Sequence, residues 1–138
     1  MTKNNLILGV DPGNSKTGVA LVTDQGEIKN TAVLLMVNFP EALAEFLAQQ
    51  VIELCILGNG TTSVGMAKVL GQLLPQTTLK IVDEAHSTEE ARKLYWQLNP
   101  PKGLRKLFPL GMQLPPENLD GLAAAVLVRR YLAQGTLS

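Results

Sequence analysis

The sequence predicts a single α/β domain, residues 1–138, built around a mixed β-sheet, and three observations support this fold class. Apolar runs of strand length occur at residues 6–10, 54–57 and 79–82. Segments with apolar residues at helical spacing alternate with the later runs. The chain has 138 residues, of which 46% are hydrophobic, enough for the core of one domain.

The first third of the chain predicts a β-meander. The run 6–10 is apolar throughout and ends at Asp11-Pro12-Gly13, which is typical of a buried strand followed by a turn. A second strand is expected at 17–22. Asp24-Gln25-Gly26 then favours a hairpin into a third strand around residues 28–37.

The middle of the chain alternates helices with strands. Residues 40–51 predict an amphipathic helix with Pro40 in its first turn, and residues 54–57 a strand that stops at a Gly-Asn-Gly turn. A second helix is expected at 63–74, followed by a strand at 79–82. This order implies parallel strand pairing with right-handed crossovers.

Two further helices are expected in the last third. Ser87 and Glu90 have the spacing of a capping box at the start of a helix that runs to about Leu98. A long connection containing Pro and Gly follows, over residues 99–118. The final helix is predicted at 119–133, with Gly135 just past its end.

Composition narrows the functional classes. Twelve basic residues balance twelve acidic ones, so binding to an anionic partner must come from a local patch. The single cysteine, Cys55, lies in an apolar run and is expected to be a buried thiol. The sequence shows neither a signal peptide nor a membrane span, which predicts a cytoplasmic protein without a membrane partner.

Three acidic residues are expected at the ends of elements that meet at one edge of the sheet. Asp11 ends the first strand, Glu84 follows the last, and Asp120 lies in the first turn of the final helix. In sheets with parallel strands, ligand sites gather at the carboxyl ends of the strands. Carboxylates suit Mg²⁺ or Mn²⁺, whereas no Cys/His cluster is present to suit zinc.

Two such cations promote hydrolysis of phosphodiesters, and Asp11 is the expected bridging ligand because the buried strand leaves it the least freedom. Each acid also has an ordinary structural interpretation. Asp11 suits a turn before Pro-Gly, Glu84 a solvated charge, and Asp120 a favourable charge at a helix N-terminus. The three together nevertheless predict a catalytic metal site.

The order and spacing of four segments are similar to those of the YqgF/RuvX family of ribonuclease H-like nucleases. The segments are LILGVDPGNSKTGVAL, ELCILGNG, VDEAHSTEEAR and LDGLAAAVLVRRYL. The family includes pre-16S rRNA processing nucleases and proteins described as Holliday junction resolvases. The resemblance implies a five-stranded sheet of order 3-2-1-4-5 with flanking helices, and a metal site at Asp11, Glu84 and Asp120.

The chain departs from the family pattern at two places. Ala85 stands where the family usually has Arg, and Gly58-Asn59-Gly60 stands where it usually has Gly-Leu-Pro. Because an arginine fork pairs with phosphate oxygens, the first change removes a natural phosphate contact. Both departures bear on substrate contacts more than on metal binding.

A basic segment offers replacement contacts for nucleic acid. From Ala91 to Pro116 the chain has no acidic residue, and we expect Lys102, Arg105 and Lys106 to bind the nucleic-acid backbone. For the nearby Tyr95 and Trp96, packing in the core is favoured over stacking on bases. Three further residues are candidate accessory groups of the site: His86, Lys16 and Glu117. A surface or capping role for His86, and a loop charge for Glu117, are the simpler interpretations.

The predicted function is therefore a Mg²⁺- or Mn²⁺-dependent nuclease that acts on structured nucleic acid. Processing of the 5′ end of pre-16S rRNA is favoured, with resolution of branched DNA as the alternative. A non-catalytic ribosome-assembly module and an ATPase of the actin or sugar-kinase type are the rival classes. The sequence leaves open whether the protein is a monomer or a homodimer, although cleavage of a four-way junction favours a dimer.

Overall fold

The computed structural model describes residues 5–98 and 119–137, and a five-stranded mixed sheet forms its centre. The strands are β1 (Leu6–Asp11), β2 (Lys16–Thr23), β3 (Ile28–Leu35), β4 (Leu54–Gly58) and β5 (Thr78–Val82). They lie in the order β3-β2-β1-β4-β5. The pairs β1–β2 and β2–β3 are antiparallel, whereas β1–β4 and β4–β5 are parallel. The predicted meander, parallel pairing and strand order are confirmed.

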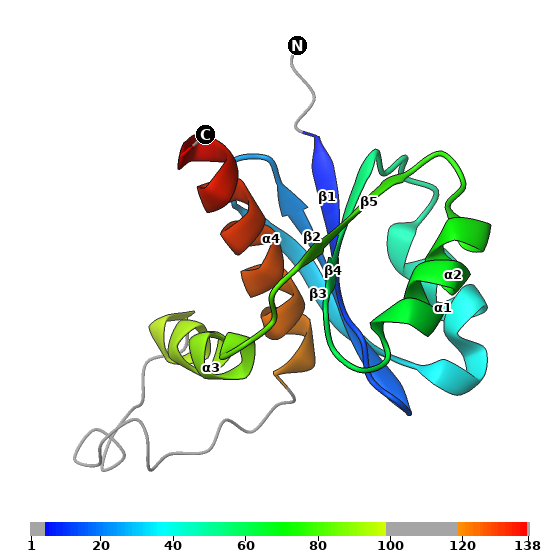
Figure 1. Cartoon of the computed structure of the whole chain (residues 1–138), viewed down its shortest axis with the longest axis horizontal. Coiled ribbons are helices and arrows are strands. Elements are labelled where there is room, and N and C mark those ends of the chain that lie inside the picture. Colours follow the sequence, from blue (N-terminus) through cyan, green and yellow to red (C-terminus); the bar gives the residue numbers. More distant parts are fainter. Residues whose placement is uncertain (1–4, 99–118, 138) are drawn as a thin grey trace.

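Helices cover both faces of this sheet (Figure 1). On one face lie α1 (Phe39–Leu47) and α2 (Ser63–Leu73), and on the other lies α4 (Asp120–Leu137), with α3 (Ser87–Leu98) packed on α4. A short 3-10 helix, η1 (Met36–Asn38), joins β3 to α1. In the described parts of the chain, no helix combines the length and apolarity required to cross a bilayer.

The alternation of side chains along the central strands divides the core into two layers. Leu8 and Val10 of β1 pack toward α1 and α2, whereas Ile7 packs toward α4. The predicted small-residue stretch of α4 lies against the sheet, with Ala124 and Ala125 fully buried. Cys55 is buried as expected, and desolvation raises the pKa of its thiol to about 12.

Two predicted elements are shorter in the structure. The third strand was expected to reach residue 37, but it ends at Leu35, and Val37 is 91% exposed in the 3-10 turn. The helix expected over 40–51 ends at Leu47. The reason is that Ala48 and Gln49 adopt left-handed φ angles of 50° and 66°, which a right-handed helix does not continue.

Two predicted helix ends also differ. Ser87 is the first residue of α3, and the Glu90 carboxylate forms an ion pair with Arg130 at 2.6 Å, so the pair does not act as the predicted capping box. Helix α4 continues to Leu137, past the Gly135 that was expected to end it. For Glu90, the ion pair with Arg130 between α3 and α4 takes the place of the local capping contact that the spacing predicted.

Candidate active site

Asp11 is held rigidly at the end of the central strand. Strand β1 is hydrogen-bonded to β2 on one side and to β4 on the other, and Asp11 pairs with Gly18 of β2. The Asp11 side chain is half-buried. The backbone of Asp11 is therefore fixed by pairing with β2, one residue beyond Val10, where the pairing of β1 with β4 ends.

Glu84 lies two residues after β5, where the Gly58-Asn59-Gly60 turn shapes its surroundings. The Glu84 backbone N–H donates to Asn59 Oδ1 at 3.1 Å. A Cβ added at Gly58 or at Gly60 would collide with the carboxylate oxygens of Glu84. The two glycines thus leave the space that the Glu84 side chain occupies, and Asn59 anchors its backbone.

Asp120 is the first residue of α4, and a third glycine lets this helix start close to the sheet. A Cβ on Gly18 would collide with the backbone carbonyl of Asp120. Because Gly18 is the strand partner of Asp11, this close approach brings the start of α4 beside the end of β1. Lys16 Nζ lies 4.0 Å from Asp120 Oδ2, so the candidate accessory lysine borders the site.

The three acids interact electrostatically in the folded chain. The pKa of Asp11 is raised from 3.8 to about 7. Burial is the largest cause, followed by a hydrogen bond in which the protonated Asp11 carboxyl donates to Glu84, and then by the negative charges of Glu84 and Asp120. Asp11 and Glu84 are therefore in direct contact, and Asp120 is close enough to add to their repulsion.

This raised pKa predicts how stability depends on pH. Between about pH 4 and pH 7 folded Asp11 holds a proton that the unfolded chain has released, so its contribution to the free energy of unfolding is lost as the pH rises through this window. We expect the melting temperature of the wild-type protein to fall between pH 5 and pH 8 for this reason. The Asp11→Asn variant should lack this part of the fall, because its amide does not titrate. Asp24→Asn, in the exposed hairpin turn, is the matched control and should behave as wild type.

The donor set matches a hard divalent cation in kind. Oxygen atoms of carboxylates are the ligands such ions prefer, and Glu84 Oε2 is buried without a hydrogen-bond partner in residues 5–98 and 119–137. In the same ranges, however, no three Asp, Glu, His or Cys side chains converge closely enough to hold an ion together. Asp11 and Glu84 thus form a pair, and Asp120 stands at its margin beside Lys16.

An arginine network holds the loop that carries Glu84. Arg130 Nη1 donates to the carbonyl oxygen of Asp83 at 2.7 Å, and its Nη2 donates to Glu90 Oε1 at 2.6 Å. One side chain of α4 thereby ties together α3 and the residue before Glu84. Truncating Arg130 would free this loop as well as the α3–α4 contact.

The structure describes only some of the other predicted site residues. His86 has a left-handed φ of 63°, and its Nδ1 lies 3.5 Å from Glu89 Oε2 in an exposed pair. Tyr95 and Trp96 are buried, with ring centroids 4.9 Å apart in a T-shaped contact, which confirms core packing. The four remaining candidates lie outside the described residues: Lys102, Arg105, Lys106 and Glu117.

The structure adds three positioning residues that the sequence did not single out. Asn59 and Gly60 shape the Glu84 pocket, and Arg130 fixes the preceding carbonyl. The departure of Gly58-Asn59-Gly60 from the family pattern was the only sequence signal for the first two. The Arg129-Arg130 pair carried no distinguishing pattern, since an arginine near the end of a helix is common.

Comparisons with known proteins identify the fold. No protein-family model and no curated protein sequence matches the chain. Among solved structures, the fowlpox virus resolvase in complex with Holliday junction DNA aligns with a TM-score of 0.58 at 11% identity, covering 93% of this chain and 99% of the resolvase. RuvC of Thermus thermophilus aligns with a TM-score of 0.55 at 11% identity, covering 95% and 96% of the two chains.

A third solved structure matches only in part. A protein of Cytophaga hutchinsonii described as a sugar kinase aligns with a TM-score of 0.44 at 20% identity. The alignment covers 64% of this chain but only 39% of that protein. The fowlpox virus resolvase and RuvC, in contrast, match over nearly their whole length. With the observed strand order, these similarities show that the chain has a ribonuclease H-like fold.

Proposed function

We propose that this protein is a divalent-metal-dependent nuclease that hydrolyses phosphodiester bonds in structured nucleic acid. One observation carries the proposal: Asp11 contacts Glu84 and is repelled by Asp120, with its pKa raised to about 7 at the carboxyl edge of a ribonuclease H-like sheet. Acidic side chains held this close together repel one another, and a bound cation would offset that repulsion.

Asp11, Glu84 and Asp120 are the residues that would hold Mg²⁺ or Mn²⁺. A bound divalent cation supplies activation of water for attack on phosphorus and stabilises the charge on the leaving oxygen. For binding, the Asp11 carboxyl must first release its proton. Asn59 and Arg130 keep the backbone around Glu84 in place. Lys16 lies beside Asp120, and a substrate phosphate bound at these acids would therefore lie near its ammonium group.

Two substrates follow from different observations. The sequence resemblance to the YqgF/RuvX family supports the precursor of 16S rRNA. The structural similarity to a resolvase bound to Holliday junction DNA supports branched DNA. Labelled rRNA precursor and a labelled four-way junction, each incubated with Mg²⁺ or Mn²⁺, distinguish them, and ATP serves as the third substrate. Cleavage of neither nucleic acid, or hydrolysis of ATP alone, would contradict the proposal.

Metal binding itself is testable without turnover. We expect Mg²⁺ or Mn²⁺ to raise the melting temperature of the wild-type protein, because an ion that binds only the folded state stabilises it. At an ion concentration of one hundred times Kd, the corresponding gain in the free energy of unfolding is about 2.7 kcal/mol. The gain should shrink in Glu84→Ala and in Asp120→Ala. Glu53→Ala, at an exposed position before β4, is the control that should keep the full gain. An unchanged gain in both site variants would place the ion elsewhere.

A further inference from the structure

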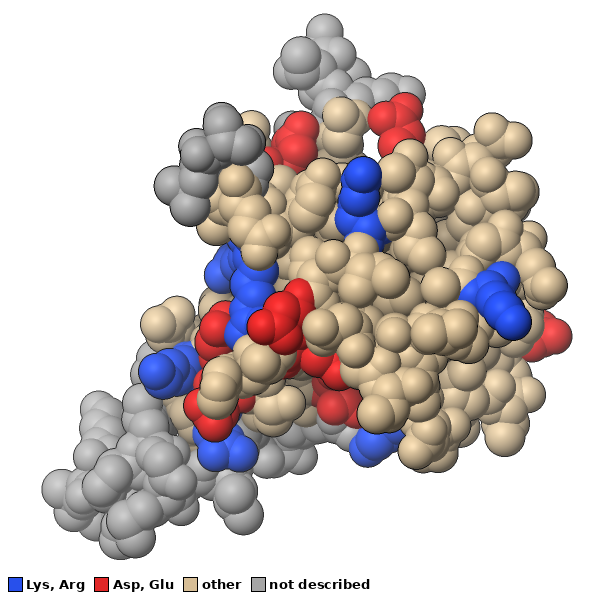
Figure 2. Space-filling model, in the orientation of Figure 1, with Lys and Arg blue, Asp and Glu red and all other residues tan. Residues whose placement is uncertain are grey.

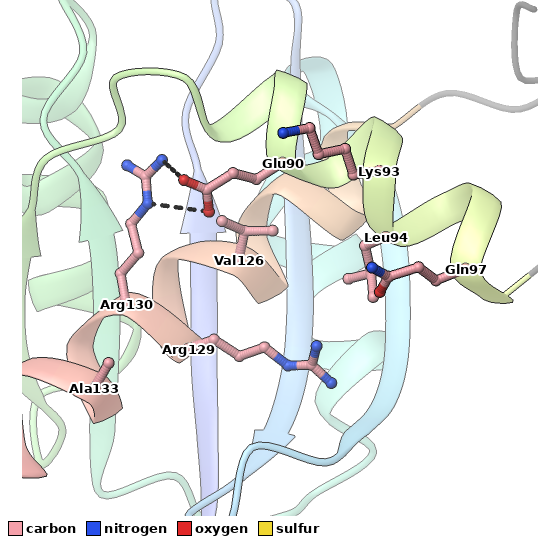
Figure 3. Close-up of a pocket in the computed structure, with 8 residues that line it drawn as sticks. All are labelled: Glu90, Lys93, Leu94, Gln97, Val126, Arg129, Arg130 and Ala133. Carbon is pink, nitrogen blue, oxygen red and sulfur yellow. Dashed lines mark hydrogen bonds and ion pairs between the residues drawn. The ribbon is translucent and has the colours of Figure 1, made fainter. Parts of the chain in front are cut away.

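A groove between α3 and α4 lies on the charged side of the molecule. It has a volume of about 370 Å³, with Lys93 on the α3 side and Arg129 on the α4 side (Figure 3). Leu94, Val126 and Ala133 supply its apolar lining. Figure 2 shows basic and acidic side chains mixed over the α3–α4 side, whereas the α2 side is mostly uncharged. The groove therefore combines charged walls with an apolar lining.

The balance of charge in this groove is positive once its ion pair is counted. Glu90 is the one acid among its lining residues, and both its oxygens accept hydrogen bonds from Arg130. The charge of Arg130 is thus balanced by Glu90, and its Nη1 donates to the Asp83 carbonyl. In the described parts of the chain, Lys93 has no ionic partner, and Arg129 uses only Nε, which donates to the Gly26 carbonyl. Two cations thus remain available to a ligand.

The groove adjoins the loop that carries Glu84. The Arg130 side chain lines the groove and at the same time binds the carbonyl of Asp83, the residue before Glu84. The groove and the Glu84 loop therefore share one side chain, and a polymer held in the groove would lie beside this loop. A repeating polyanion with apolar sugar carbons suits such a surface better than a small anion, because two cations stand on opposite walls of an apolar strip.

We propose that the α3–α4 groove binds the sugar–phosphate backbone of the nucleic-acid substrate away from the scissile bond, with Lys93 and Arg129 as its phosphate contacts. This inference rests on the proposed function for its choice of ligand. Arg130 has a different task, since it holds the groove wall and the Glu84 loop in one arrangement. An acidic protein segment is the competing occupant.

The test compares binding by two double variants with equal loss of charge. Lys93→Gln/Arg129→Gln removes the groove cations, whereas Lys68→Gln/Lys80→Gln removes two cations exposed on α2 and β5. Both are made in full-length Asp11→Asn protein to limit cleavage during the measurement. Binding of a labelled four-way junction and of an RNA hairpin is followed in Mg²⁺ from low to moderate salt. Melting temperatures verify that each variant is folded.

We expect the groove variant to bind about tenfold more weakly, with a salt slope flattened by about 1.4 to 1.8, and the control to bind as its parent does. If Arg129→Gln loses too much stability by releasing Gly26, Lys93→Glu alone tests the groove from its other wall, at an exposed position of α3. Equal losses in both double variants, or unchanged binding in the groove variant, overturn the inference. A groove variant that still binds nucleic acid but no longer binds an acidic peptide also overturns the inference.

The two proposals fail separately. If the wild-type protein cleaves its substrate and the groove variant binds normally, the groove is wrong and the nuclease assignment stands. If the wild-type protein cleaves neither nucleic acid but the groove variant alone loses binding, the groove is supported and the catalytic assignment fails.

Discussion

Replacing Asp11 with Asn should reduce cleavage by on the order of 10³-fold or more, equivalent to about 4 kcal/mol of transition-state stabilisation, while leaving the protein folded. The amide keeps the size of the side chain but removes one negative charge and, under the proposed function, one ligand of the cation. At pH 8 the free energy of unfolding should rise by on the order of 1 kcal/mol, a modest value because water screens this half-buried group. Activity and thermal unfolding of the same preparation check both effects.

Asp24→Asn provides the comparison for this result, since it makes the same chemical change in an exposed turn. It should leave both activity and stability unchanged. An Asp11→Asn protein that cleaves at the wild-type rate would remove Asp11 from the site. A protein that loses both activity and stability would show that Asp11 has a structural task in the β1 turn.

Replacing Gly60 with Ala should lower activity by about 100-fold, because the new Cβ meets the Glu84 carboxylate and must displace it. Gly60 does not have a positive φ, so the backbone itself accepts alanine. The expected damage is therefore confined to the position of the Glu84 carboxylate. Turnover, together with the metal-induced rise in melting temperature, measures this displacement, and both should fall.

Two glycines of α2 are the matched controls. A Cβ at Gly65 or Gly71 meets nothing within 4 Å. Alanine at either position should keep full activity and add about 0.5–1 kcal/mol of stability, because alanine favours a helix over glycine. If Gly60→Ala behaves like these controls, then the Gly58-Asn59-Gly60 turn does not shape the Glu84 site.

Elements with a clear apolar pattern were predictable from the sequence, and their ends were less so. The strands at 6–10 and 54–57 were found because a buried strand needs a continuous apolar run. The predicted helix over 40–51 is too long, since Val51 fits its apolar spacing but is 84% exposed beyond the left-handed turn. Nothing in that local pattern marks Ala48 as the residue that leaves the helix.

The acidic residues of the candidate site were predictable for a similar reason. Asp11, Glu84 and Asp120 stand where strands end or a helix begins, and such positions can be read from the chain. The residues that support them act through tertiary contacts: Gly60 through the side chain it lacks, and Arg130 through a carbonyl 47 positions away in sequence. Contacts of this kind depend on the packing of α4 against α3 and the sheet, which a local pattern does not encode.

A crystal structure determined after soaking with Mn²⁺ tests the central claim most directly, because the anomalous signal of manganese locates the ion without reference to any assumed ligand. We predict a peak between Asp11 and Glu84, with Asp120 drawn toward it, and no such peak in the Asp11→Asn protein. A peak elsewhere on the molecule, or a site at these acids that remains empty at saturating Mn²⁺, would contradict the assignment of this cluster as the catalytic metal centre.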